Sequence, residues 1–185
     1  MLTEMEPKNI TKESIFQALM ILMKKKDYND ITVTEITKKA GVSRMAYYRN
    51  YESKEDILTT YLDDLFQDYL QSVLKNIGPD MSELYIGFFK YFRSQEDFLK
   101  MIIKANLNSL LLKKFDEYME FILNMVFLQI EPSTVNKYEL HYAAGGIYKV
   151  LIEWVRGGMK ESDKEMADII RHLAVYPDEM KKITS

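Results

Sequence analysis

Apolar residues recur every three to four positions along nearly the whole chain, which is the spacing of one face of an α-helix. The first run carries Ile15, Leu19 and Met23 and ends in three lysines, whose positive charge suits a helix C-terminus. Later runs predict helices over 80–93, 94–104, 109–130 and 134–156, and a last helix capped by Ser162. Two short helices and one longer helix between residues 32 and 76 complete the pattern. The sequence therefore predicts nine helices and no strand, which is an all-α fold.

Two short helices are predicted after the first one. Thr32 and Glu35 have the spacing of a capping box, which starts a helix at Val33. Gly41 should end that helix, because the residue after a helix end often adopts a left-handed conformation that glycine reaches at low cost. Ser43 can then cap a third helix, which carries Tyr47 and Tyr51 four residues apart on one face.

A longer helix follows from about Ser53 to Asn76, before Gly78 and Pro79 interrupt it. Its apolar stripe is wider than the seam of a two-stranded coiled coil, so we expect it to pack on two sides and to join two modules. We place the first module at residues 1–54 and the second at residues 55–185.

The formal net charge of −3 conceals two halves of opposite sign. Residues 1–54 contain ten Lys and Arg against seven Asp and Glu, whereas residues 55–185 contain fifteen against twenty-one. An excess this small is often an ordinary solvated surface. It also fits a first module that meets an anionic partner.

The sequence lacks the residues that several classes of function require. There is no cysteine, and His141 and His172 do not stand in a metal-binding spacing. Hydrolase and phosphate-loop motifs are missing too, so we expect no catalytic residue, no metal and no cofactor. No stretch approaches the ~18 apolar residues of a membrane span, and Glu4 and Glu6 are unlike the start of a signal peptide. We therefore expect a cytoplasmic protein with no membrane partner.

The segment from Thr32 to Lys54 has the size of a helix-turn-helix, whose second helix enters the DNA major groove. Ile36, Tyr47 and Tyr51 can hold the two helices against the first one. This leaves six residues to face outward, namely Arg44, Met45, Ala46, Tyr48, Arg49 and Asn50. Arginine can bond guanine or phosphate, and a tyrosine hydroxyl can donate to phosphate.

The stretch AGVSRMAYYRNYESKEDIL resembles the start of TetR family transcriptional regulators. The resemblance implies duplex operator DNA as a partner, with Arg44 opening the recognition helix and Tyr48 and Lys54 contacting phosphates. Base contacts are then expected from Arg44, Met45, Ala46 and Arg49, and further phosphate contacts from Thr32, Thr34 and Ser43. Met45 and Ala46 depart from the glycine and threonine that are common in the family.

The stretch HYAAGGIYKVLIEWVRGGMKESDKEMADIIRHL resembles the C-terminal domain of a TetR subgroup common in Gram-positive bacteria, which includes regulators of the dihydroxyacetone kinase type. Gly145 and Gly146 lie in the middle of a predicted helix. Each of them destabilises that helix by ~1 kcal/mol relative to alanine. Close approach of a neighbouring helix, from the same chain or across a symmetric homodimer, explains them. The predicted dimer interface consists of Ala143, Gly146, Ile147, Val150, Leu151, Trp154, Ile169, Ile170 and Leu173.

Aromatic residues and methionines are frequent from residue 61 to residue 130. A filled core and a ligand pocket both account for them. The predicted pocket residues are Tyr61, Phe66, Tyr69, Phe88, Phe92, Phe98, Tyr118 and Met119, and their character implies a small apolar or aromatic effector. The sequence thus predicts a homodimeric DNA-binding regulator. The resemblance to the TetR family implies that it acts as a repressor. The alternatives are a ligand-binding or protein-docking helical module without operator binding, and a helical enzyme whose active site no motif marks.

Overall fold

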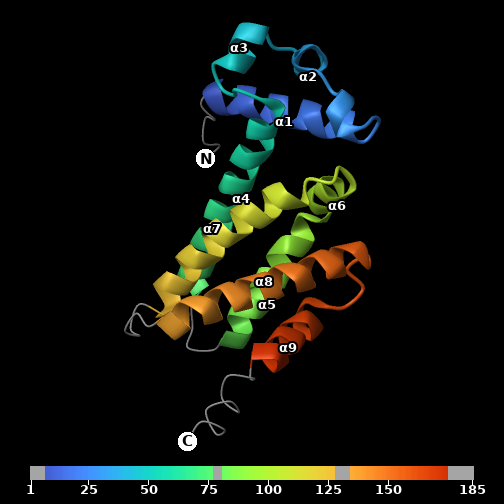
Figure 1. The fold of residues 1–185 in the computed structure, drawn as a ribbon. Coiled ribbons are helices and arrows are strands. Elements are labelled where there is room, and N and C mark those ends of the chain that lie inside the picture. Colours follow the sequence, from blue (N-terminus) through green and yellow to red (C-terminus); the bar gives the residue numbers. More distant parts are fainter. Residues whose placement is uncertain (1–6, 77–80, 128–133, 175–185) are drawn as a thin grey trace, which may run out of the picture.

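Helix α4 (Lys54–Asn76) connects the two parts of the computed structural model, which describes residues 7–76, 81–127 and 134–174 (Figure 1). At its first end lies the head, made of α1 (Pro7–Met23), the 3-10 turn η1 (Tyr28–Asp30), α2 (Val33–Ala40) and α3 (Arg44–Tyr48). Around its other part lies the body, made of α5 (Met81–Ser94), α6 (Glu96–Lys104), α7 (Asn108–Phe127), α8 (Thr134–Arg156) and α9 (Asp163–Ala174). The described residues thus form nine α-helices without a strand, and the all-α prediction is confirmed.

The head has the local signals that its sequence predicts. The capping box of Thr32 and Glu35 begins α2, and Gly41 ends it with φ at 69°, in the left-handed region. The Ser43 hydroxyl accepts a hydrogen bond from the Ala46 amide and caps α3. Helix α3 is shorter than predicted, because it ends at Tyr48, so Tyr51 lies beyond it.

The core of the head comes from all of its helices. Ile15 and Leu19 of α1, Ile36 of α2 and Tyr47 of α3 are fully buried against one another and against Ile57 of α4. Since α1 packs on both α2 and α4, the helix-turn-helix pair has a fixed platform.

An aromatic stack joins the head to the body. Tyr61 of α4 lies parallel to Phe16 of α1, with ring centroids 3.7 Å apart, and meets Phe98 of α6 edge-on at 4.7 Å. Phe16 and Phe98 are buried, and the Tyr61 hydroxyl donates to Gln95 Oε1 at 3.2 Å. This contact fixes α6 beside α1 as well as beside α4.

Arg93 fastens the α8–α9 connection to α5. Its guanidinium bonds the Asp163 carboxylate at 2.8 Å and the carbonyls of Met159 and Glu161 at 2.7 and 2.5 Å. It also lies 4.6 Å from the ring centroid of Trp154, whose indole donates to the same Glu161 carbonyl. One side chain therefore holds three elements, and α5 and α9 are extensively packed.

Among the residues that the structure describes, no helix has the length and apolar character needed to cross a membrane.

Arg93→Met should lower the free energy of unfolding by about 2 kcal/mol, because it keeps the aliphatic stem but leaves the partly buried Met159 carbonyl, the exposed Glu161 carbonyl and Asp163 without their charged donor. Urea denaturation measures this loss. The matched control is Arg171→Met, which breaks an exposed pair with Asp168 on α9 and should cost less than about 0.5 kcal/mol. Equal losses in the two variants would contradict the proposed fastening.

Candidate nucleic-acid interface

Helix α3 presents a polar and basic face to solvent at the end of the head. Arg44 and Arg49 are exposed, Met45 is 82% exposed and Tyr48 is 52% exposed. On the opposite side, Tyr47 is fully buried, and burial raises its pKa to about 12, so it remains a neutral core residue. The sequence analysis predicted that Arg44, Met45, Tyr48 and Arg49 face outward, and all four side chains are exposed.

Asn50 does not lie free on this face, contrary to the sequence prediction. It stands after the end of α3, half-buried, and its amide donates to the Ala46 carbonyl at 2.7 Å. Ala46 itself is half-buried. Asn50 thus satisfies a carbonyl at the helix end, so it is not an outward base reader in this conformation.

The three hydroxyl groups that were predicted to contact phosphates differ in whether their protons remain free to donate. The Thr32 hydroxyl is engaged with Glu35, to which it donates at 2.8 Å. Ser43 is exposed and only accepts in its cap bond, so its proton can still be donated to a phosphate. Thr34 is exposed in the first turn of α2.

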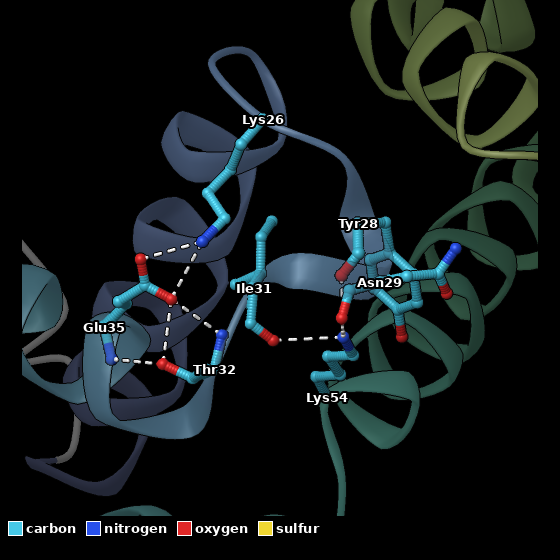
Figure 2. Close-up of polar contacts among 7 residues, drawn as sticks. All are labelled: Lys26, Tyr28, Asn29, Ile31, Thr32, Glu35 and Lys54. Carbon is cyan, nitrogen blue, oxygen red and sulfur yellow. Dashed lines mark hydrogen bonds and ion pairs between the residues drawn. The ribbon is translucent and has the colours of Figure 1, made fainter.

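Lys54 is in a different place from the one its predicted role requires. Its ammonium donates to the carbonyls of Tyr28, Asn29 and Ile31, at 2.6, 3.0 and 3.0 Å, as Figure 2 shows. It also lies 4.5 Å from the centroid of the Tyr28 ring. An ammonium has three donors, and all three are used here. All three donors are therefore engaged inside the head, and the phosphate contact, which stays a prediction, would require their release.

Glu35 links the turn that follows α1 to the start of α2. One carboxylate oxygen accepts from the Thr32 amide and hydroxyl, and both oxygens accept from Lys26, at 2.9 and 3.1 Å (Figure 2). The bonds from Lys26, followed by those from Thr32, lower the pKa of Glu35 from 4.5 to about 2. The capping carboxylate is thus ionised over the whole neutral range.

The predicted ligand residues separate into two groups. Phe66, Tyr69, Phe88, Phe92 and Tyr118 pack on one another in the body, the rings of Phe66 and Tyr118 being stacked at 3.5 Å. Tyr61 and Phe98 instead line a half-open groove of about 220 Å³ between α1 and α6. The Met119 side chain lies outside the described residues.

The predicted dimer residues also separate. Leu151, Trp154 and Ile170 are buried within the subunit, so they present no surface to a second copy. Ala143, Ile147 and Val150 are half-buried, Gly146 is exposed, and Ile169 and Leu173 are 41% and 50% exposed. A Cβ built on Gly145 or Gly146 meets no described atom within 4 Å, so close packing inside the subunit does not explain these glycines.

Two short helices joined at a left-handed glycine, with basic and tyrosine side chains exposed on the second, define a helix-turn-helix protein with a helical body. A family model described as "Bacterial regulatory proteins, tetR family" matches residues 12–60, and one described as "Transcriptional regulator C-terminal region" matches residues 79–176. The chain therefore belongs to the TetR family of transcriptional regulators.

Individual relatives are distant. The biofilm operon icaADBC negative transcriptional regulator IcaR of Staphylococcus epidermidis is 25% identical over 98 residues, which are 51% of this chain and 53% of the relative. The chain thus spans about half the length of this relative, and less of the others.

Solved structures share the fold over nearly the whole chain. A TetR regulator from Streptococcus agalactiae 2603V has a TM-score of 0.70 at 19% identity and covers 90% of this chain and 94% of its own. The dihydroxyacetone kinase operon activator DhaS has a TM-score of 0.63 at 17% identity, with coverages of 93% and 98%. The narrower resemblance of the C-terminal sequence to the dihydroxyacetone kinase subgroup stays a prediction.

The pH dependence of stability should carry the signature of Glu35. Because its pKa is lowered on folding, its stabilisation is fully present above pH 4.5 and is lost as the pH falls towards about 2. The difference in unfolding free energy between the wild type and Glu35→Gln should therefore shrink over that interval. Urea denaturation at a series of pH values measures it, and parallel curves would show that the bonds to Lys26 and Thr32 add no stability that depends on the ionisation of Glu35.

Proposed function

We propose that the protein is an operator-binding regulator that places α3 in the major groove of duplex DNA. The exposed row Arg44, Met45, Tyr48 and Arg49, on a helix held rigidly by buried Tyr47, is the observation that carries the proposal. The buried Tyr47 side chain fixes the helix. The guanidinium groups of Arg44 and Arg49 and the apolar side chain of Met45 remain available to contact base edges. Such an activity would take place in the bacterial cytoplasm.

The side chains have distinct roles in this proposal. Arg44 and Arg49 donate to base edges, the preferred partner being guanine O6 and N7. Met45 and Ala46 offer apolar contact to a thymine methyl group. The hydroxyls of Tyr48, Ser43 and Thr34 donate to phosphates and fix the register of the helix.

We further propose that two subunits bind together, with residues 1–54 as the DNA-binding domain and residues 55–185 as the effector and dimerisation domain. The exposed pair Ile169 and Leu173 on α9 and the open space above Gly145 and Gly146 on α8 support a contact between subunits. A symmetric contact would set the spacing of the two recognition helices on a near-palindromic site.

The direction of regulation we propose is repression, released by a small apolar or aromatic effector. A relative is named as a negative regulator, whereas a structural neighbour is named as an activator. The groove between head and body has an aromatic wall that includes Tyr61, and its other lining residues include the polar Gln17, Lys24, Ser94, Gln95 and Asp97. An effector there would bear on α1 and α6 together and so alter the placement of the heads.

Selection of duplexes from a random library, followed by fluorescence anisotropy, tests the proposal. Arg49→Ala should shift the preferred base at one or two positions, with a loss of ~1–3 kcal/mol on the original site. Arg156→Ala, which changes another exposed arginine, on α8, is the control and should leave the preference unchanged.

Three results would contradict parts of this proposal. Wild-type protein that enriches no sequence would favour the docking-module alternative. An unchanged preference in Arg49→Ala would remove Arg49 from the base-reading set. A panel of small aromatic compounds that never alters operator affinity would remove the effector.

The combined substitution Ile169→Glu and Leu173→Glu should make the protein monomeric, because two charges would be placed on the proposed apolar contact. Sedimentation equilibrium measures the change. Leu112→Glu, on an exposed apolar residue of α7, is the control that should keep the wild-type mass. A dimer that survives the double substitution would move the interface away from α9.

A further inference from the structure

We propose that Lys54 is a positioning residue that ties the start of α4 to the helix-turn-helix, and not a phosphate ligand. The inference rests on the proposed DNA-binding function. It gives a mechanical role to the side chain that, by family resemblance, should have faced DNA.

The three partners of Lys54 close one turn of chain around a single cation. Tyr28, Asn29 and Ile31 belong to η1 and its end, and their carbonyls converge on the ammonium at 2.6, 3.0 and 3.0 Å. Carbonyls gathered at the end of a helical turn carry partial negative charge, which a cation stabilises. The ring of Tyr28 covers the same ammonium at 4.5 Å.

The surroundings of Lys54 are poor for a phosphate. Glu52, Glu55 and Asp56 stand within two residues of it, and Glu52 and Glu55 are exposed. Nearby cap donors are also used, since the Glu52 amide donates to the Asp56 carboxylate at 3.1 Å and the Asp56 amide donates to the Ser53 hydroxyl at 3.0 Å. A DNA phosphate would meet like charge there.

A single peptide unit connects Lys54 to α2. The carbonyl of Ile31 accepts from Lys54, and the amide of the same peptide, that of Thr32, donates to Glu35 at 2.9 Å. Glu35 in turn holds Lys26, which lies in the turn that follows α1 (Figure 2). The start of α4 is thus connected by hydrogen bonds to the N-terminus of α2 and to the turn that follows α1.

The consequence is a defined path from the body to the recognition helix. Helix α4 also contacts α5 and α7, so a displacement of α4 reaches Lys54, and Lys54 acts on the peptide that begins α2. Since α2 packs against α3, that peptide sets the angle of the reading helix. Lys54 is therefore the polar link through which α4 reaches the start of α2, beside the apolar contacts that α4 makes with α1.

Lys54→Met tests this in two independent ways. In DNA-free protein, hydrogen exchange of the amides over 28–36 should accelerate while that of α8 stays unchanged. On a duplex selected with the wild type, affinity should fall on the order of tenfold. The slope of log K against log salt should stay the same, because no phosphate contact is lost.

The result that would overturn the proposal is a salt slope smaller in magnitude by ~0.9 in Lys54→Met, with unchanged hydrogen exchange over 28–36. It would identify Lys54 as a phosphate ligand. Lys54→Gln guards against misfolding of the Met variant, because its amide donates to carbonyls without charge. It should recover part of the affinity and of the exchange protection relative to Lys54→Met. No recovery of either would also count against the proposal. If wild-type protein binds no duplex, the DNA-binding function fails, whereas the exchange experiment still tests the link.

Discussion

The fixed start of α4 is the constraint on which the rest of this structure depends. Lys54 holds that start to η1, and one helical turn later Ile57 and Leu58 are fully buried in the core. Farther along, Tyr61 stacks between α1 and α6. Because an α-helix is stiff over this length, these contacts set the direction in which α4 enters the body. The head and the body are therefore positioned by a single element.

The body continues the same arrangement with polar contacts at its edges. Asp63 of α4 pairs with Lys114 of α7 at 2.8 Å and accepts a hydrogen bond from Tyr118, whose ring stacks on Phe66. Arg93 closes the other side by binding the chain between α8 and α9. Apolar packing supplies most of the burial, while these polar contacts join particular pairs of elements at the edges of the body.

Local sequence was sufficient for most of the elements and for four of the six residues predicted to face outward from α3. Thr32 with Glu35, Gly41 and Ser43 are cap signals within a few residues, and their geometry follows from backbone chemistry alone. Burial was harder to predict. Ile169 and Ile170 are neighbours in an apolar helix, yet one is exposed and the other buried, because the packing of α9 on α5 selects the face. The end of α3 at Tyr48 and the inward turn of Asn50 were also missed, because no glycine or proline marks the helix end between Arg44 and Lys54.

The sequence by itself determined an all-α chain, a capped helix-turn-helix and a basic front half, since each of these depends on neighbours three or four residues away. Only the tertiary structure decided what Lys54 does. Its three carbonyl partners lie 23 to 26 residues earlier in the chain, and no periodic pattern relates them to it. The family resemblance suggested a phosphate ligand. The fold satisfies all three of its donors internally, because closing the head brings the end of η1 to the first turn of α4.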